Sequence, residues 1–198
     1  MTTQRVVPTD EQLGHFARQQ HDWFERVRKG SLDPNAVVRA VHTIIDRTIP
    51  ADGEKFELTL DFSAPEADPI QMVRGDGYDS PEKWQFTGEK LSGVQTRVFK
   101  LVRVGYCRNL DEVRQKLGQY GVVPEGQWRV AFKAVFPHHD GQGPIGFADP
   151  SWVGPNGYVL FWYLDSDSVS RFSWTEGGRG ENWRWLVPAS PADKPASK

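Results

Sequence analysis

The residues best suited to metal chemistry stand together in one short polar segment, His138-His139-Asp140. Imidazole nitrogens and carboxylate oxygens are ordinary ligands for zinc and similar ions. Adjacent side chains of an extended segment point in opposite directions, so His138 and Asp140 could share a site that His139 could not easily join. No third ligand stands at a metal-ligand spacing, and the same residues suit a polar loop between a helix and a sheet. A metal-dependent enzyme is therefore our third hypothesis, and we expect no cofactor.

Nucleophilic catalysis would depend on Cys107, the single cysteine of the chain. A reactive thiolate needs a neighbouring base and a lowered pKa, and His138 or His139 could reach Cys107 only through the fold. A lone cysteine after a valine-rich strand is more typical of a small buried side chain. Ser151 and Ser173 lack the glycine-flanked turn of a hydrolase nucleophile. The sequence therefore favours a binding protein over an enzyme.

A basic segment from Arg97 to Lys133 could form a nucleic-acid-binding surface. Its members are Arg97, Arg103, Arg108, Arg114, Lys116, Arg129 and Lys133. Basic side chains interleaved with aromatic ones suit single-stranded nucleic acid. The whole chain has a net charge of −2, which excludes a globally basic DNA-coating protein. Residues 50–90 carry 4 basic and 10 acidic side chains and could neutralise the segment. A nucleic-acid-binding accessory protein centred on Arg97, Arg103, Arg114 and Lys133 is our second hypothesis.

Tryptophans gather at the other end of the chain. Six of the eight lie between residues 128 and 185: Trp128, Trp152, Trp162, Trp174, Trp183 and Trp185. One sheet face covered by helices could bury some of them, but Trp152, Trp162, Tyr163 and Trp174 need not all fit there. An exposed aromatic row is suited to gripping a partner protein, a sugar ring or a base. The alternative is a small core filled with large side chains. Our preferred hypothesis is a non-catalytic protein that binds another protein through this aromatic sheet face and the neighbouring basic surface.

Two helices are predicted at the start of the chain, forming a helical hairpin over residues 9–49. Thr9 and Gln12 make a capping box, apolar residues follow at helical spacing, and Gly30 is placed to end the helix. Asp33-Pro34 opens the second helix, because aspartate is a good N-cap and proline costs nothing at the first helical position.

Residues 55–137 predict a strand, a loop, a second strand and two helices. Residues 56–62 and 94–104 alternate in polarity, as half-buried strands do. The segment 63–81 is rich in Asp, Pro and Gly, and we predict a long loop there. Asn109 caps one helix that ends near Gly121, and Pro124 begins the other. The buried side of this last helix is predicted to carry Trp128, Ala131, Phe132 and Val135.

Residues 144–187 predict a β-meander of short aromatic strands, and residues 188–198 predict a disordered tail. The order of elements predicts one α+β domain over residues 1–187, with the helical hairpin packed on a mostly antiparallel, Trp-rich sheet. The single cysteine suits a reducing compartment, and there is no apolar run long enough for a signal peptide or a membrane span. We therefore expect a cytoplasmic protein without a membrane partner. The oligomeric state is not indicated.

A block from Trp128 to Val187 resembles an uncharacterised family of bacterial proteins. It includes the pattern Trp-x-x-x-Phe-Lys that begins at Trp128, then Asp149-Pro-Ser-Trp152, Phe172-Ser-Trp174 and Trp183-Arg-Trp-Leu-Val187. The same proteins are similar to the chain at Gly30-Ser-Leu-Asp-Pro34. The family has no assigned activity, so the resemblance implies a bacterial, cytoplasmic protein and assigns no site residue.

Overall fold

The structure is a computed structural model that describes residues 9–31, 33–34 and 49–190. The chain divides into two compact units, residues 1–46 and 47–198, and each is described by itself. The expectation that residues 1–187 form one domain stays a prediction.

The first unit contains helix α1, Asp10–Arg28, which confirms the first predicted helix. Gly30 ends it as expected, because its φ of 70° lies in the left-handed region that glycine tolerates. The Gly30 N–H donates to the Val27 carbonyl, and the Ser31 N–H donates to the Arg26 carbonyl. The second helix of the predicted hairpin falls mostly on residues 35–48, outside the described residues.

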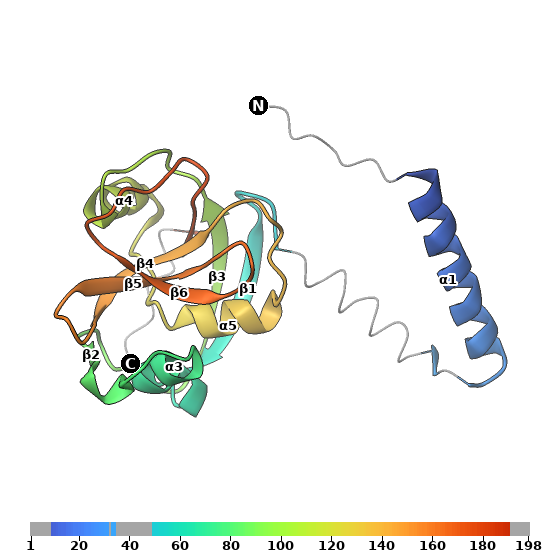
Figure 1. The fold of residues 1–198 in the computed structure, drawn as a ribbon, viewed down its shortest axis with the longest axis horizontal. Helices are drawn as coiled ribbons and strands as arrows, with labels where there is room; N and C mark the ends of the chain where they lie inside the picture. The colour runs from blue at the N-terminus through green and yellow to red at the C-terminus, as the bar shows by residue number, and fades with distance from the viewer. Residues whose placement is uncertain (1–8, 32, 35–48, 191–198) are drawn as a thin grey trace. The chain divides into compact units, whose positions relative to one another are not determined.

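The second unit is built on a seven-stranded sheet, which confirms the predicted α+β fold (Figure 1). The strands are β1 (Lys55–Asp61), β2 (Gln85–Phe86), β3 (Val94–Val102), β4 (Ile145–Val153), β5 (Val159–Leu164), β6 (Ser170–Trp174) and β7 (Arg184–Pro188). Their order is β1-β3-β7-β4-β5-β6, with β2 paired to β4. Strands β4 to β6 follow one another as a meander. Strand β7 returns between β3 and β4 and makes the one parallel pairing of the described sheet, with β4.

The predicted disordered tail, residues 188–198, overlaps the end of strand β7. Pro188 ends β7 and pairs with Phe99 of β3. The Ala189 N–H then donates to the Val98 carbonyl at 2.9 Å. The rest of the predicted tail, residues 191–198, lies outside the described residues.

The prediction of a long loop over residues 63–81 is wrong. This segment forms the 3-10 turn η1 (Pro65–Ala67) and helix α3 (Pro69–Gly75), and the 3-10 turn η2 (Pro81–Lys83) begins at its end. Asp68 caps α3, because its Oδ1 accepts the N–H groups of Ile70 and Gln71 at 3.0 and 2.9 Å. A proline then occupies the first helical position, where its missing N–H costs nothing.

Helices α4 (Leu110–Leu117) and α5 (Trp128–Val135) confirm the two helices predicted before the meander. Asn109 caps α4 as expected, since its Oδ1 accepts the Glu112 N–H at 2.9 Å. Helix α5 begins at Trp128 rather than at Pro124. Its predicted buried residues Trp128, Ala131 and Phe132 are buried. Val135 is exposed instead, because Phe136, beyond the last turn, packs into the core in its place.

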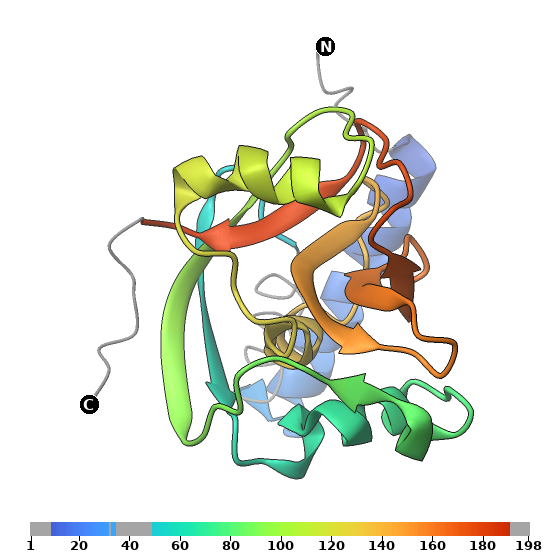
Figure 2. The ribbon, with the colours of Figure 1, turned by 90° about the vertical axis from the view of Figure 1, so that its left-hand side faces the viewer.

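Helices cover both faces of the sheet, as Figures 1 and 2 show: α4 lies on one side of the strands, and α3 and α5 lie on the other. The core therefore consists of two clusters of buried side chains. Trp162 of β5 belongs to the cluster under α3 and α5, whereas its neighbour Phe161 belongs to the cluster under α4. No helix within the described ranges is long and apolar enough to cross a membrane.

Strand β6 is the last strand in the sheet order. Side chains form hydrogen bonds with backbone groups on its outer edge. The Phe172 N–H donates to the Tyr78 hydroxyl oxygen at 2.8 Å. The Trp174 carbonyl accepts a hydrogen bond from the guanidinium of Arg179.

Candidate functional site

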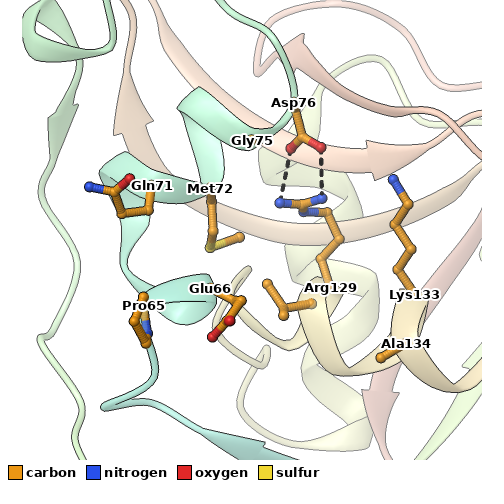
Figure 3. Close-up of a pocket in the computed structure, with 10 residues that line it drawn as sticks. Pro65, Glu66, Gln71, Met72, Gly75, Asp76, Arg129, Lys133 and Ala134 are labelled. Atoms are coloured by element: carbon orange, nitrogen blue, oxygen red, sulfur yellow. Dashed lines mark hydrogen bonds and ion pairs between the residues drawn. The ribbon is translucent and has the colours of Figure 1, made fainter.

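A pocket of about 490 Å³ lies between α3, η1 and α5, and we call it the α3–α5 pocket (Figure 3). This volume is within the range of small-molecule sites in proteins. Its lining residues are Pro65, Glu66, Gln71, Met72, Gly75, Asp76, Arg129, Val130, Lys133 and Ala134. The pocket therefore combines charged groups with an apolar wall.

A buried ion pair joins the two helices at the inner wall of the pocket. Arg129 Nη1 donates to Asp76 Oδ1 at 3.2 Å, and Arg129 Nη2 lies 2.9 Å from Asp76 Oδ2. The two side chains are only 5% and 11% exposed. The guanidinium also lies over the Trp162 ring, 4.1 Å from its centroid, in a favourable cation–π position. These contacts fix the position and the orientation of the Arg129 charge.

Burial shifts the pKa of each member of this pair more than the charge of its partner does. Burial raises the pKa of Asp76 above its ordinary value, although the charges of Arg129 and Lys133 oppose the rise. Burial likewise lowers the pKa of Arg129, against the effect of Asp76. Burying the two charges costs desolvation free energy, and this cost offsets much of the stability that their attraction adds to the fold.

Two cationic side chains meet on one hydroxyl group beside the ion pair. Ser170 Oγ accepts Arg129 Nη1 at 2.6 Å and Lys133 Nζ at 3.3 Å. Asp76 pairs with Arg129, whereas within the described residues no carboxylate oxygen lies within 4.0 Å of Lys133 Nζ. This wall thus carries one more positive than negative charge. The Ser170 side chain also forms a hydrogen bond with Asp76, so Ser170 links both cations to the buried carboxylate. The additional positive charge of Lys133 suits this wall to holding an anion.

The predicted aromatic surface is mostly core. Trp152 and Trp162 are completely buried, so they cannot contact a partner. The reason is that α3 and α5 cover the sheet face on which these rings lie. Tyr163 is half-buried and packs on Trp183, with ring centroids 5.1 Å apart. Only Trp174 among the four predicted aromatic residues is largely exposed, at 62%.

The predicted basic surface is largely neutralised by neighbouring groups. Arg97 donates to Glu125 Oε2 at 2.9 Å, and Arg103 donates to Asp52 Oδ2 at 2.6 Å. Arg103 also donates to two backbone carbonyls, those of Asn182 and Gln142.

The remaining basic residues do not extend this surface. Arg108 and Lys116 both pair with Glu112. Arg114 is exposed on α4, and Lys133 lines the pocket. The structure therefore separates the members of the predicted patch.

The predicted metal ligands His138, His139 and Asp140 lie in a loop, and the contacts of His139 and Asp140 stabilise it. Arg184, which is completely buried, donates to both carboxylate oxygens of Asp140 at 2.6 Å. His139 Nδ1 accepts the Gly141 N–H at 2.9 Å, so Nε2 carries the ring proton and donates to the Gly143 carbonyl at 3.0 Å. His138 is exposed. In the part of the chain that the structure describes, no three His, Cys, Asp or Glu side chains form a group that could hold a metal.

The lowered pKa of Asp140 agrees with this structural role. Burial would raise the pKa, but the hydrogen bonds from Arg184 and from the Gln142 N–H outweigh that effect.

The sequence did not predict the α3–α5 pocket. Asp76 lies in the segment for which the sequence predicts a loop, and Lys133 is expected there on an open surface. One signal is present: Arg129 stands between Trp128 and Ala131, on a helix whose other side chains are mostly apolar. A charged residue in such a position needs a buried counter-ion.

Comparisons of the chain with protein-family models, with curated proteins and with solved structures found no match. The resemblance of residues 128–187 to a bacterial family therefore stays a prediction.

Proposed function

We propose that this chain is a non-catalytic binding protein that holds a small organic anion in the α3–α5 pocket. The observation that supports it best is the charge excess at the inner wall. Lys133 and Arg129 converge on one hydroxyl oxygen, and Asp76, the acid beside them, forms its ion pair with Arg129. A carboxylate entering the pocket would add a negatively charged acceptor for Lys133 beside the neutral Ser170 oxygen.

The ion pair gives this site a rigid base. Arg129 is held by Asp76, Ser170 and Trp162, so it needs no rearrangement when a ligand binds. A hydrogen bond from an ammonium to a carboxylate contributes about 1.5–3 kcal/mol. Met72 and Val130 add apolar surface on which the rest of the ligand can pack.

The Lys133→Met variant tests this function, with Lys90→Met as the matched control because Lys90 is exposed and does not line the pocket. We expect short-chain monocarboxylates to bind to the wild type and to Lys90→Met, measured by calorimetry and by the rise in melting temperature. Lys133→Met should bind at least about tenfold more weakly. Equal binding by both variants, or no binding to the wild type, would contradict the proposal.

A second candidate function is binding of a protein partner through the exposed aromatic pair Tyr158 and Trp174. These side chains are 57% and 62% exposed, and their ring centroids lie 5.7 Å apart. Tyrosine and tryptophan are enriched among the residues that contribute most to protein interfaces. The test compares the proteins that the immobilised wild type retains with those retained by Trp174→Ser, and Lys133→Met is the control. Retention that Trp174→Ser leaves unchanged would exclude this surface.

Nucleic-acid binding through the basic segment stays a prediction. The ion pairs of Arg97, Arg103 and Arg129 reduce the charge available for phosphate groups.

A further inference from the structure

Within the described residues, two charged side chains of the α3–α5 pocket form no ion pair at a distance of 4.0 Å or less. Glu66 belongs to η1 and Lys133 to α5. Among these residues, no basic nitrogen lies within 4.0 Å of the Glu66 carboxylate, and no carboxylate oxygen lies within 4.0 Å of Lys133 Nζ. They line the same pocket but do not pair with each other.

The two charges stand on opposite sides of the Arg129 side chain (Figure 3). Figure 3 shows Glu66 near Pro65 on the η1 side and Lys133 on the other side of the Arg129 side chain. Met72 lies on the Glu66 side of Arg129, and it is buried. The Asp76–Arg129 ion pair is neutral as a whole, so the charges left for a ligand are the negative charge of Glu66 and the positive charge of Lys133.

We propose that the ligand of this pocket is an extended zwitterion, an amino acid whose ammonium and carboxylate groups are separated by a methylene chain. The inference rests on the proposed function and adds a second pole to it. The ligand carboxylate accepts hydrogen bonds from Lys133, and its ammonium group donates to Glu66. The methylene chain crosses the apolar surface of Met72 and Val130. An α-amino acid carries both charged groups on one carbon, and we expect it to bind more weakly than a ligand whose two groups are separated.

A homologous series of ligands tests the spacing. Glycine, γ-aminobutyrate, ε-aminocaproate and ω-aminooctanoate are titrated into the full chain, with caproate and hexylamine as probes of a single charge. We expect affinity to pass through a maximum at an intermediate chain length. The best zwitterion should bind about tenfold more tightly than caproate, which lacks the second ion pair.

Variants at each pole separate this inference from the proposed function. Glu66→Gln should lower the affinity of the best zwitterion to that of caproate and leave caproate binding unchanged. Lys133→Met should weaken both. Glu82→Gln, at an exposed glutamate of η2 that does not line the pocket, is the matched control.

The possible outcomes separate the proposed zwitterionic ligand from the proposed anion site. If caproate binds as tightly as every zwitterion and Glu66→Gln changes nothing, the zwitterion is excluded while the anion site stands. If no carboxylate binds to the wild type, both proposals fail. Melting temperatures of the unliganded variants verify folding, and the exposed position of Glu66 makes Glu66→Gln a mild change.

Discussion

Three buried arginines illustrate how differently one side chain can be accommodated. Arg129 and Arg184 each face a carboxylate, Asp76 and Asp140 respectively. Arg179 is also buried, but it donates to the Gly178 and Trp174 carbonyls and lies over aromatic rings. Burial lowers the pKa of Arg179, as it does for Arg129. Each guanidinium thus fastens a loop or a helix end to the sheet.

The Asp76–Arg129 pair predicts a specific pattern of destabilisation. Asp76→Asn and Arg129→Met each leave a buried charge without its partner, so each should lower the free energy of unfolding by about 3 kcal/mol. The double variant should cost clearly less than the two single changes together, because no isolated charge remains. Urea unfolding at neutral pH measures all three.

The pair formed by Arg103 and Asp52 is the control for that cycle. Both side chains are about one-third exposed, so Asp52→Asn should cost less than about 1 kcal/mol. Additive losses for Asp76 and Arg129 would show that the two charges do not depend on each other.

At the scale of elements, α3 is the helix that the sequence did not reveal. A helix of seven residues is too short to display apolar periodicity, and the Asp and Gly around it are typical of loops. The Asp68-Pro69 pair is nevertheless the same helix-start signal as Asp33-Pro34. The helices α1, α4 and α5 and most of the strands were predictable, because their longer patterns and their caps agree.

The cap of α3 can be tested directly. Asp68→Ala removes the acceptor of two N–H groups and should lower the free energy of unfolding by about 1 kcal/mol, whereas Asp68→Ser retains a cap. Chemical denaturation compares the two variants. Because α3 forms one wall of the pocket, Asp68→Ala should also weaken carboxylate binding more than Asp68→Ser. Equal stability of the two variants would contradict the role of this cap.

At the scale of the whole molecule, the coverage of both sheet faces explains why the tryptophans are more buried than expected. Helices on one face alone would leave part of the aromatic residues exposed. With α4 on one side and α3 and α5 on the other, Phe161 and Trp162 are both buried although they point to opposite faces. Strand β5 carries an unbroken apolar run over Val159–Leu164 rather than an alternating one, and such a run is typical of a strand that is buried on both faces.

The distribution of charge was more informative than its total. The acidic segment 50–90 does pair with the basic segment 91–137, through Asp52 with Arg103 and through Asp76 with Arg129. Other basic residues pair within their own segment, as Arg97 does with Glu125. The pocket could not be predicted in this way, because it depends on α3 and on which charges remain without a partner after folding.

The outer side of β6 has a consequence for how these molecules behave at high concentration. An unpaired strand at the border of a sheet can recruit a strand from another chain, which is a common start of aggregation. Here the Tyr78 hydroxyl occupies the Phe172 N–H, and Arg179 occupies the Trp174 carbonyl. Intermolecular pairing along β6 would have to break both contacts first, so this border is protected by the chain's own side chains.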